Sequence, residues 1–238
     1  MKEKMEQAAG HYANDQHNGH LTIAIDGPSG AGKSTVARLV ADHLGLAYID
    51  TGAMYRAVAL KAMEEGVDPG DSPALGRLAG EAVIELVPTG GGLEIWLDGR
   101  NVTLAIRGRE VSGLVARVAA VPEVRAWLVQ RQRELAARGG VVMEGRDIGT
   151  NVLPGAPYKF YITADPAVRA HRRSDECRAD TEPARQVVAR EMTERDRLDA
   201  ARPADPLCAA DDAVVLDSTS LSAEQVAEQI WSRVTGRG

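Results

Sequence analysis

The stretch IDGPSGAGKST, residues 25–35, decides how the rest of the chain is interpreted. It lies between the short apolar run LTIAI, residues 21–25, and a segment with helical periodicity at residues 36–44. Its glycines allow backbone N–H groups to turn inward around a phosphate chain, and a helix that follows adds the positive end of its dipole. We therefore predict a strand, a phosphate-binding loop and a helix, in that order.

The loop fits the pattern G-x-x-x-x-G-K-[ST] and predicts a site for a nucleoside triphosphate such as ATP. Lys33 is expected to reach the β- and γ-phosphates, and the hydroxyl of Ser34 to ligate Mg²⁺. The alternative is a glycine turn with a solvated lysine, but the chain has only five lysines. The candidate ATP-binding residues of the loop are Gly27, Pro28, Ser29, Gly30, Ala31, Gly32, Lys33, Ser34 and Thr35.

Strand-like and helix-like segments alternate through most of the chain. Further strands are predicted at residues 46–50, 140–144, 158–163 and 213–218, each followed by a helical pattern. This rhythm predicts an α/β fold of the P-loop NTPase type, with a mostly parallel sheet covered by helices on both faces. Ligands of such sheets bind beyond the carboxyl ends of the strands.

One region breaks the alternation. Residues 82–106 contain short β-rich runs separated by PTGGG and DGRN, which predict antiparallel hairpins. A helix is predicted after them, with Pro122 near its start and Gly139 past its end. We predict a small α+β subdomain at residues 76–138, inserted into a core of residues 21–75 and 139–238.

Composition narrows the possible partners. The chain has 238 residues, of which 44% are hydrophobic and 26% charged, and its net charge is −6. This charge does not favour nucleic acids or anionic membranes, and no apolar run approaches the ~20 residues that span a bilayer. Two cysteines make no disulfide framework, which suits a reducing cytoplasm. Residues 1–20 are predicted to be a disordered extension, and the protein to be a cytoplasmic monomer.

A triphosphate site does not by itself name a reaction. The chain has no N-K-x-D stretch for guanine, and no apolar strand ends in an Asp-Glu pair as in motor ATPases. Arginines follow the predicted strand ends at Arg56 and Arg146, and nine more lie between Arg169 and Arg202. Kinases use such groups to neutralise the transferring phosphoryl group. Eight carboxylates share that last span, so the arginine run alone is equally typical of a solvated surface.

Longer motifs carry a more specific resemblance. The segments IDTGAMYRAVAL, VAAVPEVR, EGRDIGTNVLPGAPYKFYITADPAVRAHRR, ERDRLDAARPADPL and VVLDSTSLSAEQV follow the phosphate loop in order. From about residue 21 to its end the chain resembles the bacterial cytidylate kinases, a family of nucleoside monophosphate kinases. The resemblance implies transfer of the terminal phosphoryl group of ATP to CMP or dCMP with Mg²⁺. It also implies that residues 76–138 bind the monophosphate and that residues 166–185, approximately, form a lid.

The resemblance assigns roles residue by residue. Arg56, Arg146 and Arg202 would clamp the acceptor phosphate and act in catalysis with Lys33. Asp147 and Arg125 would meet the cytosine edge, where a carboxylate suits the amino group. The implied CMP-binding residues are Thr51, Tyr55, Arg56, Arg125, Arg146, Asp147, Arg195, Asp199 and Arg202, and those of the lid over ATP are Arg169, Arg172 and Arg173.

Several points stay open at the level of sequence. Asp26 could orient magnesium-bound water or brace the loop, and Ala116 stands where some relatives carry a serine near the nucleotide. A helix over residues 195–202 would place Arg195, Asp199 and Arg202 on one face. A kinase for UMP or shikimate is an alternative that the hairpin insertion and EGRDIGT disfavour. A regulatory nucleotide switch is another, and it would not release ADP in response to CMP.

Overall fold

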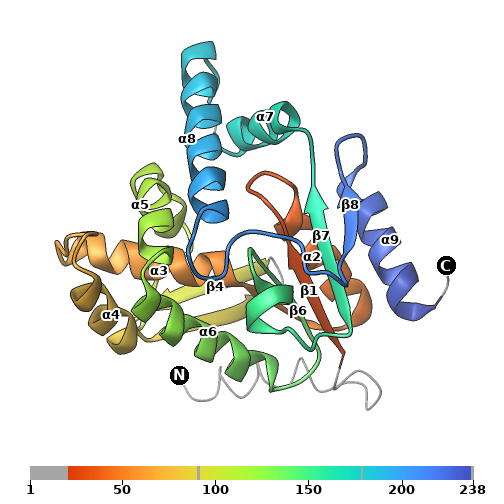
Figure 1. Cartoon of the computed structure of the whole chain (residues 1–238), viewed down its shortest axis with the longest axis horizontal. Coiled ribbons are helices and arrows are strands. Elements are labelled where there is room, and N and C mark those ends of the chain that lie inside the picture. The colour runs from red at the N-terminus through yellow and green to blue at the C-terminus, as the bar shows by residue number, and fades with distance from the viewer. Residues whose placement is uncertain (1–20, 90–91, 178, 237–238) are drawn as a thin grey trace. The chain divides into compact units, whose positions relative to one another are not determined.

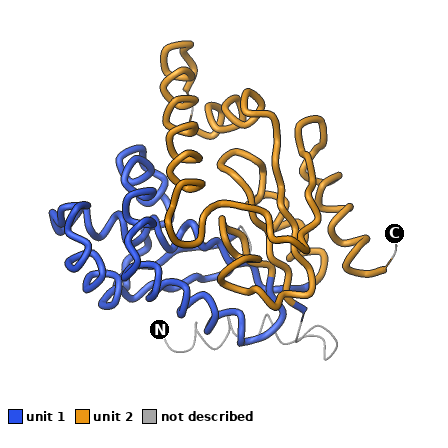
Figure 2. The backbone as a smooth tube through the Cα atoms, in the orientation of Figure 1, with its two compact units in different colours: residues 1–21, 45–141 blue, residues 22–44, 142–238 orange. Residues whose placement is uncertain are grey.

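The computed structural model describes residues 21–89, 92–177 and 179–236 (Figure 1). The predicted extension, residues 1–20, lies outside the described residues, as do two glycines of the predicted PTGGG turn and one lid residue. The chain forms two compact units (Figure 2). The first unit holds Gly45–Val141 together with Leu21, and the second holds Thr22–Leu44 and Val142–Gly238.

The larger sheet has five strands in the order β2-β6-β1-β7-β8. Strand β7 pairs in parallel with β1 on one side and with β8 on the other, so the predicted parallel sheet is confirmed. Each strand begins and ends within one residue of its prediction. The strands are β1 (Thr22–Asp26), β2 (Ala47–Asp50), β6 (Val141–Gly145), β7 (Tyr158–Thr163) and β8 (Val214–Asp217).

The second unit builds its core on β1 and β7. Ile25 of β1 lies opposite Phe160 of β7, and both are buried, as expected for strands covered on both faces. Helices flank these strands, and α2 packs on α9, where the rings of His43 and Trp231 stack at 4.1 Å. The helices of this unit are α2 (Lys33–Leu44), α7 (Pro166–Glu176), α8 (Glu182–Ala200) and α9 (Ala223–Thr235), with a single π-helical turn, η2 (Ile148–Val152).

The first unit contains the predicted hairpins. Strands β3 and β4 pair antiparallel from Ile84 with Leu97 to Thr89 with Gly92, and β5 pairs with β4. Its helices enclose a core that includes Leu75 and Leu128. The elements are α3 (Thr51–Glu64), α4 (Ser72–Glu81), β3 (Ile84–Thr89), β4 (Gly92–Leu97), β5 (Arg100–Asn101), η1 (Ala105–Arg107), α5 (Arg109–Ala119) and α6 (Pro122–Ala136).

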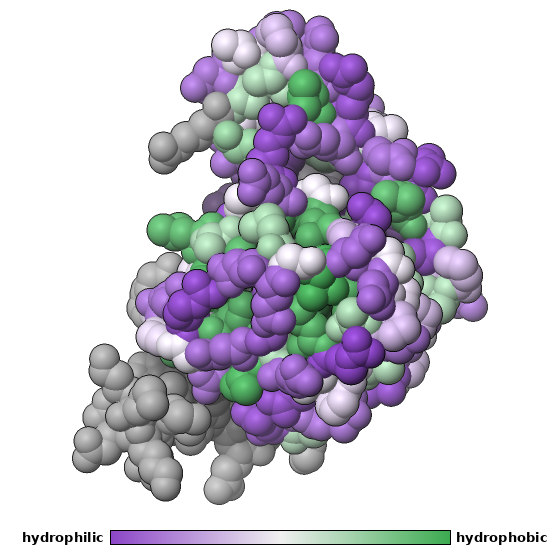
Figure 3. All heavy atoms as spheres, turned by 90° about the vertical axis from the view of Figure 1, so that its left-hand side faces the viewer, coloured by the Kyte–Doolittle hydropathy of each residue, from purple (hydrophilic) through white to green (hydrophobic). Residues whose placement is uncertain are grey.

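One face of the molecule can be compared by hydropathy. On the face drawn in Figure 3, hydrophilic side chains cover most of the surface, with hydrophobic ones between them. Across residues 21–89, 92–177 and 179–236, no helix combines the length and the apolar character that a membrane crossing requires.

Two glycines allow α4 to lie close against α6 in the first unit. A methyl group at Gly76 would lie 2.6 Å from Cβ of Glu123, and one at Gly80 would lie 2.8 Å from the ring of Trp127. Real side chains do not tolerate such distances, so the two helices would have to move apart.

We expect Gly76→Ala to lower the free energy of unfolding by about 1–3 kcal/mol because of this overpacking. Gly113→Ala in α5 is the matched control, since a methyl group there meets nothing within 4 Å. It should raise the free energy of unfolding by up to about 1 kcal/mol through helix propensity. Urea denaturation followed by circular dichroism measures both, and a Gly76 variant as stable as the Gly113 variant would contradict the packing argument.

Candidate active site

The phosphate loop connects β1 to α2 in a shape that needs glycine at two points. Gly27 has φ of +145°, and a methyl group there would lie 2.0 Å from the carbonyl oxygen of Ile162 in β7. Gly30 has φ of +72°, and a methyl group there would lie 2.6 Å from the carbonyl oxygen of Arg169. The loop is therefore seated against β7 and α7, and any other residue at either position would displace it.

Lys33 opens α2 and is buried, with only 6% of its surface exposed. Its Nζ donates a hydrogen bond to the carbonyl oxygen of Pro28 at 2.7 Å. Burial, together with the positive charge of Arg146, lowers the pKa of Lys33 to about 7, although Glu144 opposes this. An anion beside Nζ would favour the ammonium again. Ser34 is exposed in the first turn of the same helix.

Asp26, at the end of β1, braces the segment that follows β6. Its two carboxylate oxygens accept hydrogen bonds from the backbone N–H groups of Ile148, at 2.8 Å, and Gly149, at 2.7 Å. Burial is the largest cause that raises the pKa of Asp26 to about 6, and the nearby Asp147 adds to it. Asp26 therefore braces the segment directly after Arg146 and Asp147, and these two hydrogen bonds do not go to the phosphate loop.

Three guanidinium groups surround the buried carboxylate of Asp199. Nε of Arg146 lies 3.0 Å from Oδ2, Nε of Arg195 lies 3.9 Å from the same oxygen, and Nη2 of Arg202 lies 3.8 Å from Oδ1. Burial alone would raise the pKa of Asp199, but the three arginines hold it below its ordinary value. These four side chains together carry more positive than negative charge, which suits an anionic ligand, although Asp196 and Glu144 also raise the pKa of Arg146.

A continuous helix over residues 195–202, which would have placed Arg195, Asp199 and Arg202 on one face, does not form, because α8 ends at Ala200. Pro203 disfavours helical backbone at Arg202, the residue before it. The arginine reaches the cluster by a turn instead, and its Nε donates to the carbonyl oxygen of Asp199 at 3.2 Å.

Two buried nitrogens of the predicted phosphate-binding arginines have no hydrogen-bond partner among the described residues. They are Nη2 of Arg202, in the second unit, and Nε of Arg56, in the first. Buried polar atoms in folded proteins are nearly always paired, so such exceptions require an explanation. A bound phosphate oxygen would supply the missing acceptor.

Within the first unit, the predicted CMP residues gather at the start of α3. Thr51 is the first residue of this helix, and Asp50 caps it by accepting from the N–H of Ala53. Nη2 of Arg56 lies 3.3 Å from Oδ2 of Asp50. Tyr55 lies one turn after Thr51 in α3, and its Oη accepts a hydrogen bond from Nη1 of Arg125 in α6 at 3.4 Å.

The three predicted lid arginines have different hydrogen-bond partners. Arg169 donates through Nη1 to the carbonyl oxygen of Ser29 at 3.0 Å, so it reaches the phosphate loop. Arg172 donates to Oγ of Ser218 at 3.0 Å and to its carbonyl oxygen at 2.7 Å. Arg173 pairs with Glu176 of its own helix at 2.8 Å.

Sequence reasoning missed two residues that contact the loop. Ser218, just past β8, donates through Oγ to the carbonyl oxygen of Ala31 at 3.1 Å. Its place at the carboxyl end of a parallel strand was the available signal. Asp196 accepts from the N–H of Ser29 at 3.2 Å. The sequence contains no signal for Asp196, because the charged residues around it are typical of a solvated helix face.

A phosphate loop between a parallel strand and a helix, with a buried lysine and an arginine cluster beside it, defines a P-loop protein of the α/β class. A family model described as cytidylate kinase matches residues 23–236. The chain belongs to the cytidylate kinase family.

Individual relatives agree over nearly their whole length. A cytidylate kinase of Pelotomaculum thermopropionicum is 52% identical over 220 residues, covering 92% of this chain and 97% of the relative. One from Geobacillus thermodenitrificans is 49% identical, covering 91% and 97%. One from Solibacter usitatus is 48% identical, covering 94% and 96%. The family predicted from the sequence motifs is therefore confirmed.

The pKa of Asp26 gives a pH-dependent contribution to stability. Its value of about 6 in the folded protein lies above the 3.8 of an ordinary aspartate, so the folded state takes up a proton first as the pH falls. The free energy of unfolding of the wild type, relative to that of Asp26→Asn, should therefore rise by roughly 2 kcal/mol between pH 7.5 and pH 4.5. Chemical denaturation across this range measures the difference, and parallel curves for the two proteins would contradict it.

Proposed function

We propose that the protein transfers the terminal phosphoryl group of ATP to CMP or dCMP, giving ADP and CDP or dCDP. The observation that carries the proposal is the positively charged cluster of Arg146, Arg195 and Arg202 around Asp199, in the same unit as the phosphate loop with its buried Lys33. Phosphoryl transfer depends on positioning and on charge stabilisation, and these residues supply both.

On the donor side, the N–H groups of residues 27–35 would hold the triphosphate, and Lys33 would contact its β- and γ-phosphates. Arg169 and Arg172 already contact the loop and its surroundings, which supports their role in closing over ATP. Arg173 is assigned there by resemblance only, since its partner in the structure is Glu176.

On the acceptor side, Arg56, Arg146 and Arg202 would hold the CMP phosphate. The buried nitrogens of Arg56 and Arg202 that lack a hydrogen-bond partner support this assignment, because phosphate oxygens accept hydrogen bonds from guanidinium groups. Thr51, Tyr55, Arg195 and Asp199 would contact the rest of the nucleotide, with Arg195 and Asp199 at the ribose. No general base is needed, because the acceptor phosphate is already ionised at neutral pH.

Cytosine would be recognised by Asp147 and Arg125. The carboxylate of Asp147 is buried and accepts from Nδ2 of Asn151 at 3.0 Å, which fixes its orientation. It can accept a hydrogen bond from the amino group of cytosine, whereas uracil presents an oxygen at that edge. Ala116 has no hydroxyl where some relatives carry a serine, so either a backbone group, a water or the nearby Arg117 substitutes for it, or the discrimination among pyrimidine acceptors is altered.

The residues present fit Mg²⁺ in the way P-loop proteins bind it. No three side chains of His, Cys, Asp or Glu cluster as metal ligands in the part of the chain that the structure describes. Mg²⁺ needs no such cage, because it keeps several waters and is held by a hydroxyl and by substrate phosphates. The exposed Ser34 beside Lys33 can provide that hydroxyl. When bound, the ion neutralises charge on the β- and γ-phosphates.

We further propose that residues 76–138, inside the first unit, are the monophosphate-binding subdomain of the family. The flanking segments 21–75 and 139–238 would form the kinase core, with the lid at about residues 166–185. We also propose that the protein acts as a monomer in the cytoplasm. Its two cysteines are free and exposed, which fits a reducing compartment.

The decisive assay is ADP production from ATP and Mg²⁺ with CMP, dCMP, UMP, AMP or shikimate as the acceptor. We expect CMP and dCMP to raise ADP release at least 100-fold over ATP alone, and UMP, AMP and shikimate to raise it far less. The same rate with every acceptor would point to a slow nucleotide hydrolase or switch instead.

Lys33 gives a test of the donor site that does not need the acceptor. With a pKa of about 7, the free ammonium has mostly lost its proton at pH 8, and a bound triphosphate should restore it. Calorimetry at pH 8 in two buffers with different ionisation enthalpies measures the protons taken up on binding. It should find close to one proton per ATP, and this uptake should vanish below pH 6. Lys33→Arg is the matched control, because arginine stays charged throughout. Equal proton uptake by both proteins would remove Lys33 from the phosphate site.

A further inference from the structure

Asp196 in α8 contacts the phosphate loop through one carboxylate oxygen and Arg169 through the other. Oδ1 accepts from the backbone N–H of Ser29 at 3.2 Å, and Oδ2 forms an ion pair with Nη1 of Arg169. The two side chains are only 18% and 12% exposed. Because the pair is shielded from water, it is stronger than a surface salt bridge.

Arg169 also contacts Ser29, the loop residue that Asp196 contacts. Its Nη1 also donates to the carbonyl oxygen of Ser29 at 3.0 Å, and its Nε donates to the carbonyl oxygen of Ala164 at 3.1 Å. Both backbone groups of Ser29 are thus held by side chains, one from α7 and one from α8. Nη2 of Arg169 takes no part in these three bonds.

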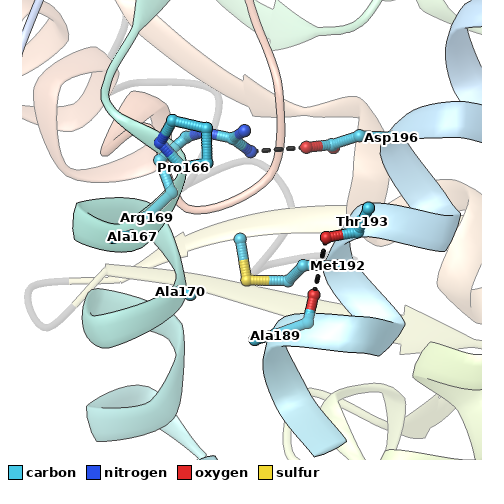
Figure 4. Close-up of a pocket in the computed structure, with 8 residues that line it drawn as sticks. All are labelled: Pro166, Ala167, Arg169, Ala170, Ala189, Met192, Thr193 and Asp196. Carbon is cyan, nitrogen blue, oxygen red and sulfur yellow. Dashed lines mark hydrogen bonds and ion pairs between the residues drawn. The ribbon is translucent and has the colours of Figure 1, made fainter. Parts of the chain in front are cut away.

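Apolar packing contributes less to the position of the loop at this point. A cavity of about 230 Å³ lies between α7 and α8, and it is lined by Ala170, Met192 and Asp196 among others (Figure 4). The side chain of Met192 enters the space between the helices, and its methyl group lies 3.0 Å from where a Cβ on Gly30 would be. Because a cavity separates the two helices here, the polar contacts of Asp196 add to the backbone contact at Gly30 in holding the loop.

We infer that Asp196 is a positioning residue for the phosphate loop and for Arg169 in the reaction proposed above, on which this inference rests. It holds the tip of the loop through Ser29 and orients Arg169 so that Nη2 remains available to a phosphate oxygen. A carboxylate does not bind a triphosphate itself, since the two repel each other, and here its charge is matched by Arg169.

Two variants separate the contributions of Asp196. Asp196→Ala removes both contacts, and Asp196→Asn keeps an acceptor for the N–H of Ser29 but loses the charge that pairs with Arg169. Glu194→Gln is the matched control. It lies on the same helix and is exposed, and its partner is Arg197 at 2.7 Å.

Equilibrium binding of ATP with Mg²⁺, equilibrium binding of CMP and hydrogen exchange of the peptide spanning residues 27–33 are measured for each protein. We expect Asp196→Ala to weaken ATP binding at least 10-fold, to lower kcat at least 10-fold and to speed exchange at Ser29 and Gly30. CMP binding should change much less than ATP binding, and the melting temperature should fall moderately because Arg169 loses its shielded partner. Asp196→Asn should lie between Asp196→Ala and the wild type, and Glu194→Gln should match the wild type.

Unchanged or tighter ATP binding by Asp196→Ala would overturn the inference, because the carboxylate would then be neutral or a competitor of the triphosphate. So would an equal loss of ATP and CMP binding together with a lower melting temperature, which indicates general destabilisation. A wild type that binds ATP but phosphorylates no cytidine nucleotide would overturn the proposed function, while exchange and ATP affinity still decide the role of Asp196. A wild type that binds no ATP would overturn both.

Discussion

Positive charge buried without full compensation is the constraint on which the second unit depends. Lys33 is held by a carbonyl oxygen rather than a carboxylate, and one aspartate serves three arginines. Burying charge in this way opposes folding unless hydrogen bonds and counter-charges offset it. The surroundings offset it in part, through Asp199 and through the carboxylates of Glu144 and Asp26. The remaining positive charge is what an anionic substrate can use.

Contacts with backbone groups fix the positions of the segments that carry these charged side chains. Strand β7 presses against the phosphate loop at Gly27, and Asp26 ties the end of β1 to the start of η2. Arg146 and Asp147 stand immediately before η2, so the carboxylate of Asp26, which braces the start of η2, also sets where these side chains begin. Preorganisation of this kind lets charge stabilisation act without reorganisation during phosphoryl transfer.

Much of this could be predicted from the sequence, for physical reasons. Four of the five strands of the large sheet are short apolar runs that end at a glycine or an aspartate, and β7 ends shortly before Pro166, which is why their bounds were right to within one residue. Motif spacing identified the loop and the family. Whether residues 195–202 are helical stayed open, and the structure ends α8 at Ala200, where Pro203 disfavours helical backbone at the residue before it.

The missed contacts have a different origin. Asp196 lies 167 residues from Ser29 in the chain, and its neighbours Arg195 and Arg197 make the segment look like an ordinary solvated helix. The periodicity of a sequence predicts which residues lie on the same face of a helix, but it does not predict what packs against that face. Only the folded chain distinguishes Asp196, which meets the loop, from Glu194, which pairs on the surface.

The arginine cluster also makes the stability of the folded protein depend on the concentration of the anions that bind to it. A ligand that binds only the native state stabilises it by an amount that grows with the logarithm of its concentration. Because guanidinium groups bind phosphate and sulfate through the same oxygens, inorganic phosphate and sulfate should share this protective effect with nucleotides. In a starved cell the same molecules would unfold more often and become substrates for proteases, so the enzyme's abundance would follow the pool that it consumes.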